Sequence, residues 1–384
     1  MENVETKSGT QPQVTVPFTA TPTGETLGIA GWAHPKVWTK RMLTTLASGV
    51  KGGKWHTLID KVYAPENLGD SARKVWKNGG ACGVDRQTVE TFAAHGRKEL
   101  QHLYEQLRNG TYCPSAVRRT WIPKPGSSEK RPLGIPTIRD RIVQTALVHV
   151  IEPILDNMFH ERSFGFRHGR SCHHALRCVE AQLEAGKVYV VDADLKSYFD
   201  TIPKDKLLAL VASVISDTRI LKLIKSYLDQ SILEELREWT PEAGVPQGAV
   251  LSPVLANLYL NPLDHRMQAK GYEMVRYADD FIILCATREE ADAALREIQD
   301  WVQAAGLTLH PTKTQIVDAR TESFSFLGYS FRGRFRFPRE KSHKKIMDRI
   351  RQLTPRKSGQ SLDSHIQKLN TVLRGWFTYF RHCF

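Results

Sequence analysis

The chain has 384 residues, 41% of them hydrophobic and 25% charged, an ordinary balance for a folded globular protein. This length exceeds what one hydrophobic core usually supports, so we expect two or three subdomains. The six cysteines include no Cys-x-x-Cys pair, which argues against a zinc ribbon. Because no signal peptide or membrane span is visible, we expect a cytoplasmic protein without a membrane partner. The net charge of +13 suits a polyanion such as nucleic acid.

The N-terminal third reads as a leader followed by helices. Residues 1–30 are rich in Thr, Pro and Gly and show no apolar periodicity, which predicts a disordered leader. Apolar residues then recur at helical spacing over 31–95, which predicts a helical extension. Residues 96–110 predict a further helix that ends at Gly110.

A hairpin and a helix are predicted next. Residues 117–123 alternate in polarity as a strand does, and residues 131–135 can return as a second strand after a turn that starts at Lys124. Residues 140–158 predict a helix.

The second half alternates strands and helices. The β-branched run 187–194 predicts a strand, and 273–285 predicts two strands around a tight turn. Helices are expected over 204–230, 251–268 and 288–305, with several short strands over 306–337 and a basic helical segment at the end of the chain. The pattern indicates an α+β protein whose antiparallel sheet has helices on one face.

Three aspartates stand at the predicted strand ends. Asp194 ends the 187–194 strand, and Asp279 and Asp280 occupy the turn of the 273–285 hairpin. Phosphoryl transfer to a nucleotide uses two divalent ions, which carboxylates in this arrangement can hold. Adjacent aspartates are also common in ordinary turns. Here, strands that look buried flank them, so their charges call for a cation.

Seven ordered motifs surround these aspartates and resemble the group II intron-encoded reverse transcriptase/maturase family. They are IPKPGSSEKRPLGIPTIRDRIVQ (122–144), SFGFRHGRS (163–171), DADLKSYFD (192–200), VPQGAVLSPVLAN (245–257), YADD (277–280), FLGYSF (326–331) and LNTVLRGWFTYFRH (369–382). The resemblance implies a right-hand polymerase with fingers over 96–186, a palm over 187–337 and a short, basic, helical thumb or maturase region over 338–384. Residues 331–384 carry 14 basic and 3 acidic side chains, a net charge of +11, as RNA binding would require.

The resemblance also implies the catalytic groups. Asp194, Asp279 and Asp280, with the Leu195 carbonyl, would hold two Mg²⁺ ions, for which Mn²⁺ is an alternative.

The nucleotide contacts follow from the same motifs. Lys124 and Arg131 would clamp the triphosphate of a dNTP, because arginine and lysine both bind phosphate. Phe199 would exclude a ribose 2′-hydroxyl, Gln247 would contact the incoming nucleotide, and Lys313 would assist proton transfer to pyrophosphate. The structural alternatives are an ordinary basic hairpin, core packing of Phe199 and a solvated Lys313.

Nucleic-acid contacts are implied at both ends of the palm. Phe326, Leu327 and Gly328 would form a primer grip, and Arg167, Arg170 and Arg374 would contact template or other RNA. The implied partners are an RNA template, a DNA or RNA primer, dNTPs and structured group II intron RNA. The sequence leaves the oligomeric state open.

The chain ends two residues after the last motif, whereas family members usually continue. We therefore expect a thumb truncated in or after this region, and neither a DNA-binding nor an endonuclease domain. Three other functions stay open: a maturase whose polymerase is idle, a reverse transcriptase used in defence or retron-like synthesis, and an RNA-templated RNA polymerase. The intact aspartate trio disfavours the first, the PQG and LRGWFTYF strings the second, and Phe199 the third.

Overall fold

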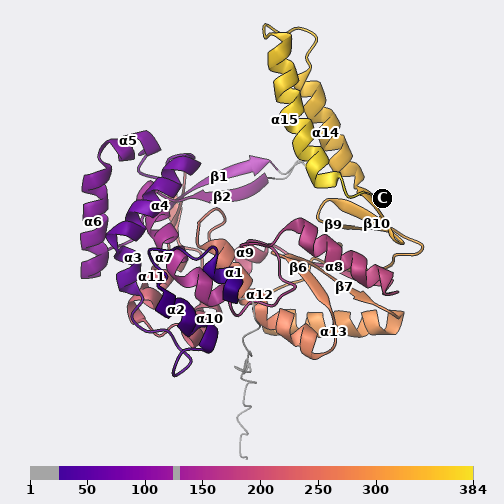
Figure 1. The fold of residues 1–384 in the computed structure, drawn as a ribbon, viewed down its shortest axis with the longest axis horizontal. Coiled ribbons are helices and arrows are strands. Elements are labelled where there is room, and N and C mark those ends of the chain that lie inside the picture. The colour runs from indigo at the N-terminus through magenta and orange to yellow at the C-terminus, as the bar shows by residue number, and fades with distance from the viewer. Residues whose placement is uncertain (1–25, 124–129, 384) are drawn as a thin grey trace, which may run out of the picture.

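The computed structural model describes residues 26–123 and 130–383, and Lys124 therefore lies outside the described residues. Figure 1 shows helices and a β-hairpin on one side, a sheet with covering helices on the other, and a pair of long helices that projects from the C-terminal end. Within the described residues, no helix is long and apolar enough to cross a membrane.

Helices make up the N-terminal part, as the periodicity predicts. They are α1 (Thr26–Ala30), α2 (Lys40–Ser48), α3 (Ile59–Tyr63), α4 (Pro65–Asn78), α5 (Val89–Ala94) and α6 (Gly96–Asn109). Gly110 ends α6 with a left-handed φ of 73°, a conformation that glycine adopts without steric cost. The predicted leader is too long at its end, because 26–30 are helical and Ile29 is buried in the core.

The fingers hairpin belongs to a four-stranded sheet of order β2-β1-β4-β5. Its strands are β1 (Val117–Pro123), β2 (Lys130–Ile135), β4 (Ile232–Glu234) and β5 (Arg237–Trp239). β4 runs parallel to β1 from more than 100 residues further along the chain. The predicted palm boundaries are therefore wrong for 232–239. These residues join the fingers sheet, because β4 pairs with the edge of β1 that β2 leaves open.

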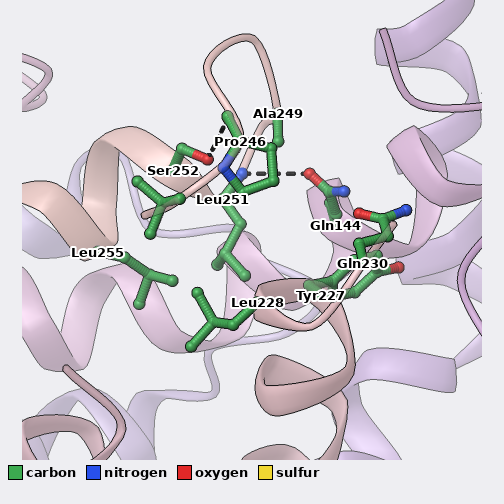
Figure 2. Close-up of a pocket in the computed structure, with 10 residues that line it drawn as sticks. Gln144, Tyr227, Leu228, Gln230, Pro246, Ala249, Leu251, Ser252 and Leu255 are labelled. Atoms are coloured by element: carbon green, nitrogen blue, oxygen red, sulfur yellow. Dashed lines mark hydrogen bonds between the residues drawn. The ribbon is translucent and has the colours of Figure 1, made fainter. Parts of the chain in front are cut away.

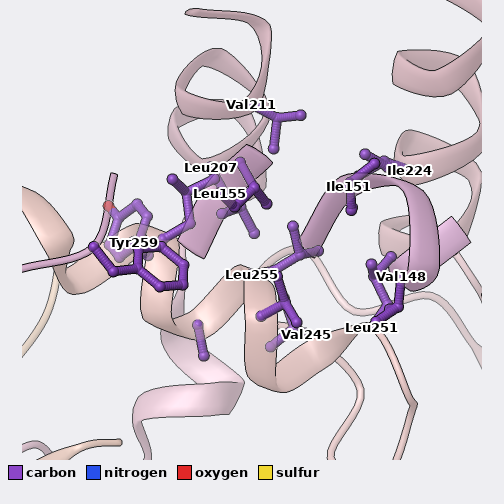
Figure 3. Packing of buried hydrophobic residues seen from close by; sticks show 14 of the residues in the cluster. Val148, Ile151, Leu155, Leu207, Val211, Ile224, Val245, Leu251, Leu255 and Tyr259 are labelled. Carbon is purple, nitrogen blue, oxygen red and sulfur yellow. The ribbon is translucent and has the colours of Figure 1, made fainter. Parts of the chain in front are cut away.

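A helical core joins fingers and palm. Its helices are α7 (Ile138–Asp156), α9 (Tyr198–Thr201), α10 (Lys204–Val214), α11 (Thr218–Leu228) and α12 (Ser252–Ala269). Figure 3 shows Ile151 and Leu155 of α7 packed with Leu255 of α12. The predicted helical segment 204–230 forms two helices, because Asp217 caps α11 and also accepts hydrogen bonds from the backbone amides of Leu58 and Ile59 at the start of α3.

The palm sheet is antiparallel, with strand order β6-β7-β3-β8. Its strands are β3 (Tyr189–Asp194), β6 (Met274–Tyr277), β7 (Asp280–Cys285) and β8 (Gln315–Asp318), and its flanking helices are α8 (Cys172–Glu184) and α13 (Arg288–Ala304). Successive residues of a strand face opposite sides. Val191 packs in the core that contains α12 and α13, whereas Val190 packs in the core that contains α8. The α+β fold is as predicted, but helices cover both faces rather than one.

A small sheet and two helices complete the chain. The sheet has order β11-β10-β9, with β9 (Phe324–Phe326), β10 (Tyr329–Arg332) and β11 (Phe335–Pro338), and the helices are α14 (Glu340–Leu353) and α15 (Leu362–Phe380). The ring of Phe380 lies 4.9 Å from that of Tyr329, which anchors the base of the helical pair on the small sheet. The region predicted to be a basic thumb forms this helical pair, which projects away from the palm sheet in Figure 1.

Candidate active site

The structure brings the three predicted aspartates together at one end of the palm sheet. Asp194 is the last residue of β3 and pairs in register with Asp280, the first residue of β7. Asp279 precedes it in the two-residue turn between β6 and β7, where Tyr277 pairs with Asp280. Directly opposite residues on antiparallel strands lie about 5 Å apart, so the carboxylates share one small space.

Buried groups that the sequence does not single out hold this turn. Arg276 is fully buried, donates to the Asp264 carboxylate at 2.8 Å and donates to the Ala278 carbonyl oxygen at 2.9 Å. Ala278 has a φ of 60°, which is unfavourable for a residue with a side chain. Gly165 of the SFGFRHGRS motif lies against it, and a Cβ there would fall 2.3 Å from the Ala278 nitrogen. Two contacts therefore hold the turn: the hydrogen bond from Arg276 and the close packing of Gly165 against Ala278.

Asp192 is a fourth carboxylate that the sequence analysis missed, although it stands two residues before Asp194 and thus on the same face of β3. Burial and then the charge of Asp194 raise the pKa of Asp192 to about 6. Burial and then the charges of Asp192 and Asp279 raise the pKa of Asp280 to about 7. Burial raises the pKa of Asp279 as well. The two-residue spacing of Asp192 and Asp194 in the sequence DAD was the signal that could have identified Asp192.

The donor set fits a divalent cation. The oxygens are hard ligands, and the carboxyl pKa values are raised first by burial and then by neighbouring negative charge, which a bound cation would compensate. Across 26–123 and 130–383, no three His, Cys, Asp or Glu side chains form a ready-made metal cage. Mg²⁺ commonly uses only one or two protein carboxylates and takes its other ligands from substrate phosphates and water. The residues present therefore suit an ion that arrives with a nucleotide.

Stability of the metal-free protein should depend on pH through these carboxyls. Because the pKa of Asp280 is raised from 3.8 to about 7, the folded state holds its proton more tightly than the unfolded state does. The contribution of Asp280 to the unfolding free energy should therefore be fully present below about pH 4 and be lost as the pH rises to about 7. Melting temperatures in EDTA between pH 5 and 8 measure this fall.

Asp280→Asn should flatten the dependence of melting temperature on pH. Asp318→Asn should leave it unchanged, because Arg320 holds the pKa of Asp318 below its usual value, so this carboxyl does not titrate between pH 5 and 8. Added Mg²⁺ should raise the melting temperature more at pH 8 than at pH 5.5, since protons compete with the metal. Identical slopes for the wild type and Asp280→Asn would show that the pKa of Asp280 is not raised in the folded protein.

Lys313 lies at the carboxylates, where it forms an ion pair with Asp194. An extension of β3 places it there: the Lys196 amide donates to the Thr308 carbonyl at 2.8 Å, and the His310 amide donates to the Asp194 carbonyl at 2.7 Å. Leu195 lies between these bonds, with its side chain buried. The ammonium group thus lies beside Asp194 on the loop before β8.

Three more residues predicted to contact the nucleotide lie on β2, on α9 and in the loop before α12. Arg131 on β2 is exposed, and its charge acts to lower the pKa of Asp279 although burial prevails. Phe199 on α9 is partly buried, and its carbonyl accepts from the Val245 amide at 2.7 Å. The side-chain amide of Gln247 donates to Asp200 at 3.1 Å, next to Phe199 in the chain. The structure therefore brings Phe199 and Gln247 together and sets Arg131 near the aspartates.

The three residues predicted to form a primer grip lie at the end of β9 and in the tight turn between β9 and β10. Phe326 is buried, and Leu327 and Gly328 have φ values of 49° and 83°. The hydroxyl of Tyr379 on α15 donates to the Leu327 carbonyl at 2.7 Å, and that of Ser342 on α14 donates to the Gly328 carbonyl at 3.1 Å. Both C-terminal helices thus hold this turn.

The three arginines predicted to contact RNA lie in different environments. Arg167 is nearly buried, and its five donors go to Asp156 and to the carbonyl oxygens of His160 and Ser163. The prediction for Arg167 is therefore wrong, because no donor is left for a phosphate.

The other two arginines differ from Arg167 in their contacts. Arg170 donates to the Glu161 carbonyl and lies 5.8 Å from the Phe164 ring. Arg374 is exposed on α15. Only Arg374 therefore stands on the surface of the C-terminal helices, and contact of either side chain with RNA stays a prediction.

Comparisons with known proteins agree with these motifs. Residues 122–331 match the family described as reverse transcriptase (RNA-dependent DNA polymerase), and residues 343–384 match the maturase-specific domain of group II introns.

Two curated proteins and one solved structure are among those similar to this chain, and they differ in identity and in the share of each chain that is covered. Protein YkfC of Escherichia coli is 32% identical over 331 residues, which cover 76% of this chain and 86% of YkfC. The group II intron-encoded protein LtrA of Lactococcus lactis is 36% identical over 194 residues, which cover 50% of this chain and only 32% of LtrA. A telomerase structure from Candida albicans has a TM-score of 0.48 at 13% identity, covering 71% of this chain and 57% of that chain.

Proposed function

This chain belongs to the reverse transcriptase family and, within it, to the group II intron type, and we propose that it is an RNA-directed DNA polymerase that also aids intron RNA splicing. The observation that carries the polymerase proposal is the register of β3 and β7, which sets Asp194 opposite Asp280 with Asp279 beside them. The complete set of carboxylates argues against an idle polymerase.

The proposed reaction is nucleotidyl transfer. The primer 3′-oxygen forms a bond to the α-phosphorus of a dNTP, and the bond from that phosphorus to pyrophosphate breaks. Asp194, Asp279 and Asp280, with the Leu195 carbonyl, would hold Mg²⁺, for which Mn²⁺ could substitute. When bound there, such an ion would supply positive charge that favours loss of the proton from the primer hydroxyl and compensates charge on the leaving pyrophosphate.

The surrounding side chains bind and orient the nucleotide. Arg131, with Lys124 beyond the described residues, binds the triphosphate, and a guanidinium suits bidentate phosphate contact. The Lys313 ammonium group leaves its ion pair with Asp194 and donates a proton to the pyrophosphate. The Phe199 ring excludes a ribose 2′-hydroxyl, while Gln247 contacts the base pair that forms.

The proposed nucleic-acid partners are an RNA template with a DNA or RNA primer. The turn at Leu327 and Gly328 orients the primer end, and Arg170 and Arg374 contact RNA phosphates. A labelled primer on an RNA template, with dNTPs and Mg²⁺, should be extended to full-length cDNA. Absence of extension with both Mg²⁺ and Mn²⁺ would overturn the polymerase proposal.

The splicing role rests on the match of residues 343–384 to the maturase-specific domain. The partner we propose is structured RNA of a group II intron that flanks the reading frame. The protein should lower the Mg²⁺ concentration needed for splicing of that RNA, because its basic helices neutralise phosphates. Splicing in vitro at low Mg²⁺ measures this effect.

Two variants separate splicing from synthesis. Asp279→Asn should splice as the wild type does, since the asparagine keeps the shape of the turn and leaves the exposed Arg374 on α15 unchanged. Arg374→Glu should reduce stimulation about tenfold, as expected when one phosphate contact becomes a repulsion. Arg288→Glu reverses an exposed charge on α13 and serves as the matched control. Equal stimulation by the wild type and Arg374→Glu would exclude this surface.

A further inference from the structure

The loop of residues 245–251 carries Gln247 and is tied to its surroundings at several points. The Val245 amide donates to the Phe199 carbonyl at 2.7 Å, and the Gly134 amide on β2 donates to the Gln247 carbonyl at 2.7 Å. The fit is tight, because a Cβ at Gly248 would lie 2.5 Å from the Gly134 oxygen. These contacts hold the first half of the loop between the fingers sheet and α9.

Gln144 holds the second half of this loop. Its side-chain oxygen accepts hydrogen bonds from the Val250 amide at 2.8 Å and the Leu251 amide at 3.3 Å. Figure 2 shows the bond between Gln144 and Leu251. Leu251 is the N-cap residue of α12 and offers no side-chain cap of its own. Gln144, 106 residues earlier on α7, therefore supplies an acceptor that the start of α12 lacks.

The chemistry of Gln144 indicates that the acceptor is its purpose. The residue is 1% exposed, and Val143 and Leu147 near it on α7 are fully buried. Within the described residues its side-chain nitrogen has no hydrogen-bond partner, and it lines a cavity of only about 10 Å³ with Gln230. A buried amide that leaves its donor unused costs free energy unless its acceptor is needed.

We propose that Gln144 is a positioning residue for nucleotide binding, which acts by fixing the 245–251 loop so that Gln247 faces the incoming dNTP. This inference rests on the proposed polymerase function. Without Gln144, the first half of the loop keeps its bonds to Phe199 and Gly134, whereas Val250 and Leu251 lose theirs. The nucleotide site then loosens while the fold and the primer site persist.

Matched substitutions test the role in single-nucleotide incorporation. Gln144→Met has similar volume but no strong acceptor, and it should raise the KM for the dNTP about tenfold, the equivalent of one or two lost hydrogen bonds. Its kcat and its affinity for primer–template should change less than about threefold. Gln144→Glu keeps the acceptor oxygen and should retain a KM close to that of the wild type. Gln182→Met removes another buried amide, on α8, and should leave all three values unchanged.

A second measurement keeps the inference independent of catalysis. Amide hydrogen exchange at Val250 and Leu251 should be faster in Gln144→Met and normal in Gln144→Glu. If the wild type extends no primer, the polymerase proposal fails, and exchange still decides whether Gln144 holds the loop. A normal KM in Gln144→Met, or an equal defect in Gln144→Glu, would overturn the positioning role. Should Gln144→Met not fold, Gln144→Asn, whose amide is one carbon shorter, should show the same rise in KM, and a normal KM there would also overturn it.

Discussion

Replacing Asp279 with asparagine should lower the rate of primer extension by about a thousandfold or more, the largest effect we expect from any single change. The amide has nearly the same shape but carries no charge, so the metal ligand set loses an anionic oxygen while the turn keeps its geometry. Arg276 and Gly165 still hold the turn, since they contact Ala278 rather than the Asp279 side chain. Extension of a labelled primer on an RNA template, followed over time on a denaturing gel, measures the rate.

The same substitution should not destabilise the metal-free protein. Burial raises the pKa of Asp279, and a neutral side chain removes that cost of ionisation. We expect a melting temperature equal to or above that of the wild type at pH 8, which separates loss of chemistry from loss of fold. Asp318→Asn, on β8 of the same sheet, should extend primers normally. Equal cDNA yields from the wild type and Asp279→Asn would refute the catalytic assignment.

Replacing Phe199 with alanine should raise ribonucleotide incorporation relative to deoxynucleotide incorporation by about a hundredfold, because removing the ring opens space for a 2′-hydroxyl. The Phe199 backbone is tied to the loop of Gln247 through the Val245 amide, so the ring position is linked to that of the nucleotide site. The ratio of kcat/KM for a ribonucleotide to that for the matching dNTP is the quantity to compare.

Loss of core packing must be separated from loss of the gate. Phe199 is partly buried against the main core, as is Leu208 on α10. Leu208→Ala should therefore lower the melting temperature to a similar degree and leave the ratio unchanged. If Phe199→Ala also leaves the ratio unchanged, its ring serves packing alone and deoxynucleotide selectivity has another origin.

Local sequence patterns predicted most of the secondary structure and the positions of the three aspartates at strand ends. The β-branched run before Asp194 predicts β3, and the turn at Asp279 predicts the β6–β7 hairpin, because strand and turn preferences act over a few residues. Glycine at position 110 predicts the end of α6 in the same way. The seven motifs added the order of these elements, which identified the family before any contact was known.

Pairings between distant segments decided what local patterns could not. Strands β4 and β5 join the fingers sheet, and α8 covers the second face of the palm, because each buries an edge or face that another part of the chain leaves open.

The same limit applies to single side chains. Arg167 and Arg276 look like surface charges in the sequence, yet both are buried with acidic partners, and their roles depend on those partners. Asp192 matters because its charge acts on Asp280 across the sheet. Gln144 matters because it accepts a hydrogen bond from the distant Val250 amide. The sequence by itself therefore determined which chemistry the palm carries, because that chemistry is written in contiguous motifs. Only the tertiary structure decided which buried side chains hold those motifs in place, because burial and hydrogen bonding are properties of residues brought together by folding.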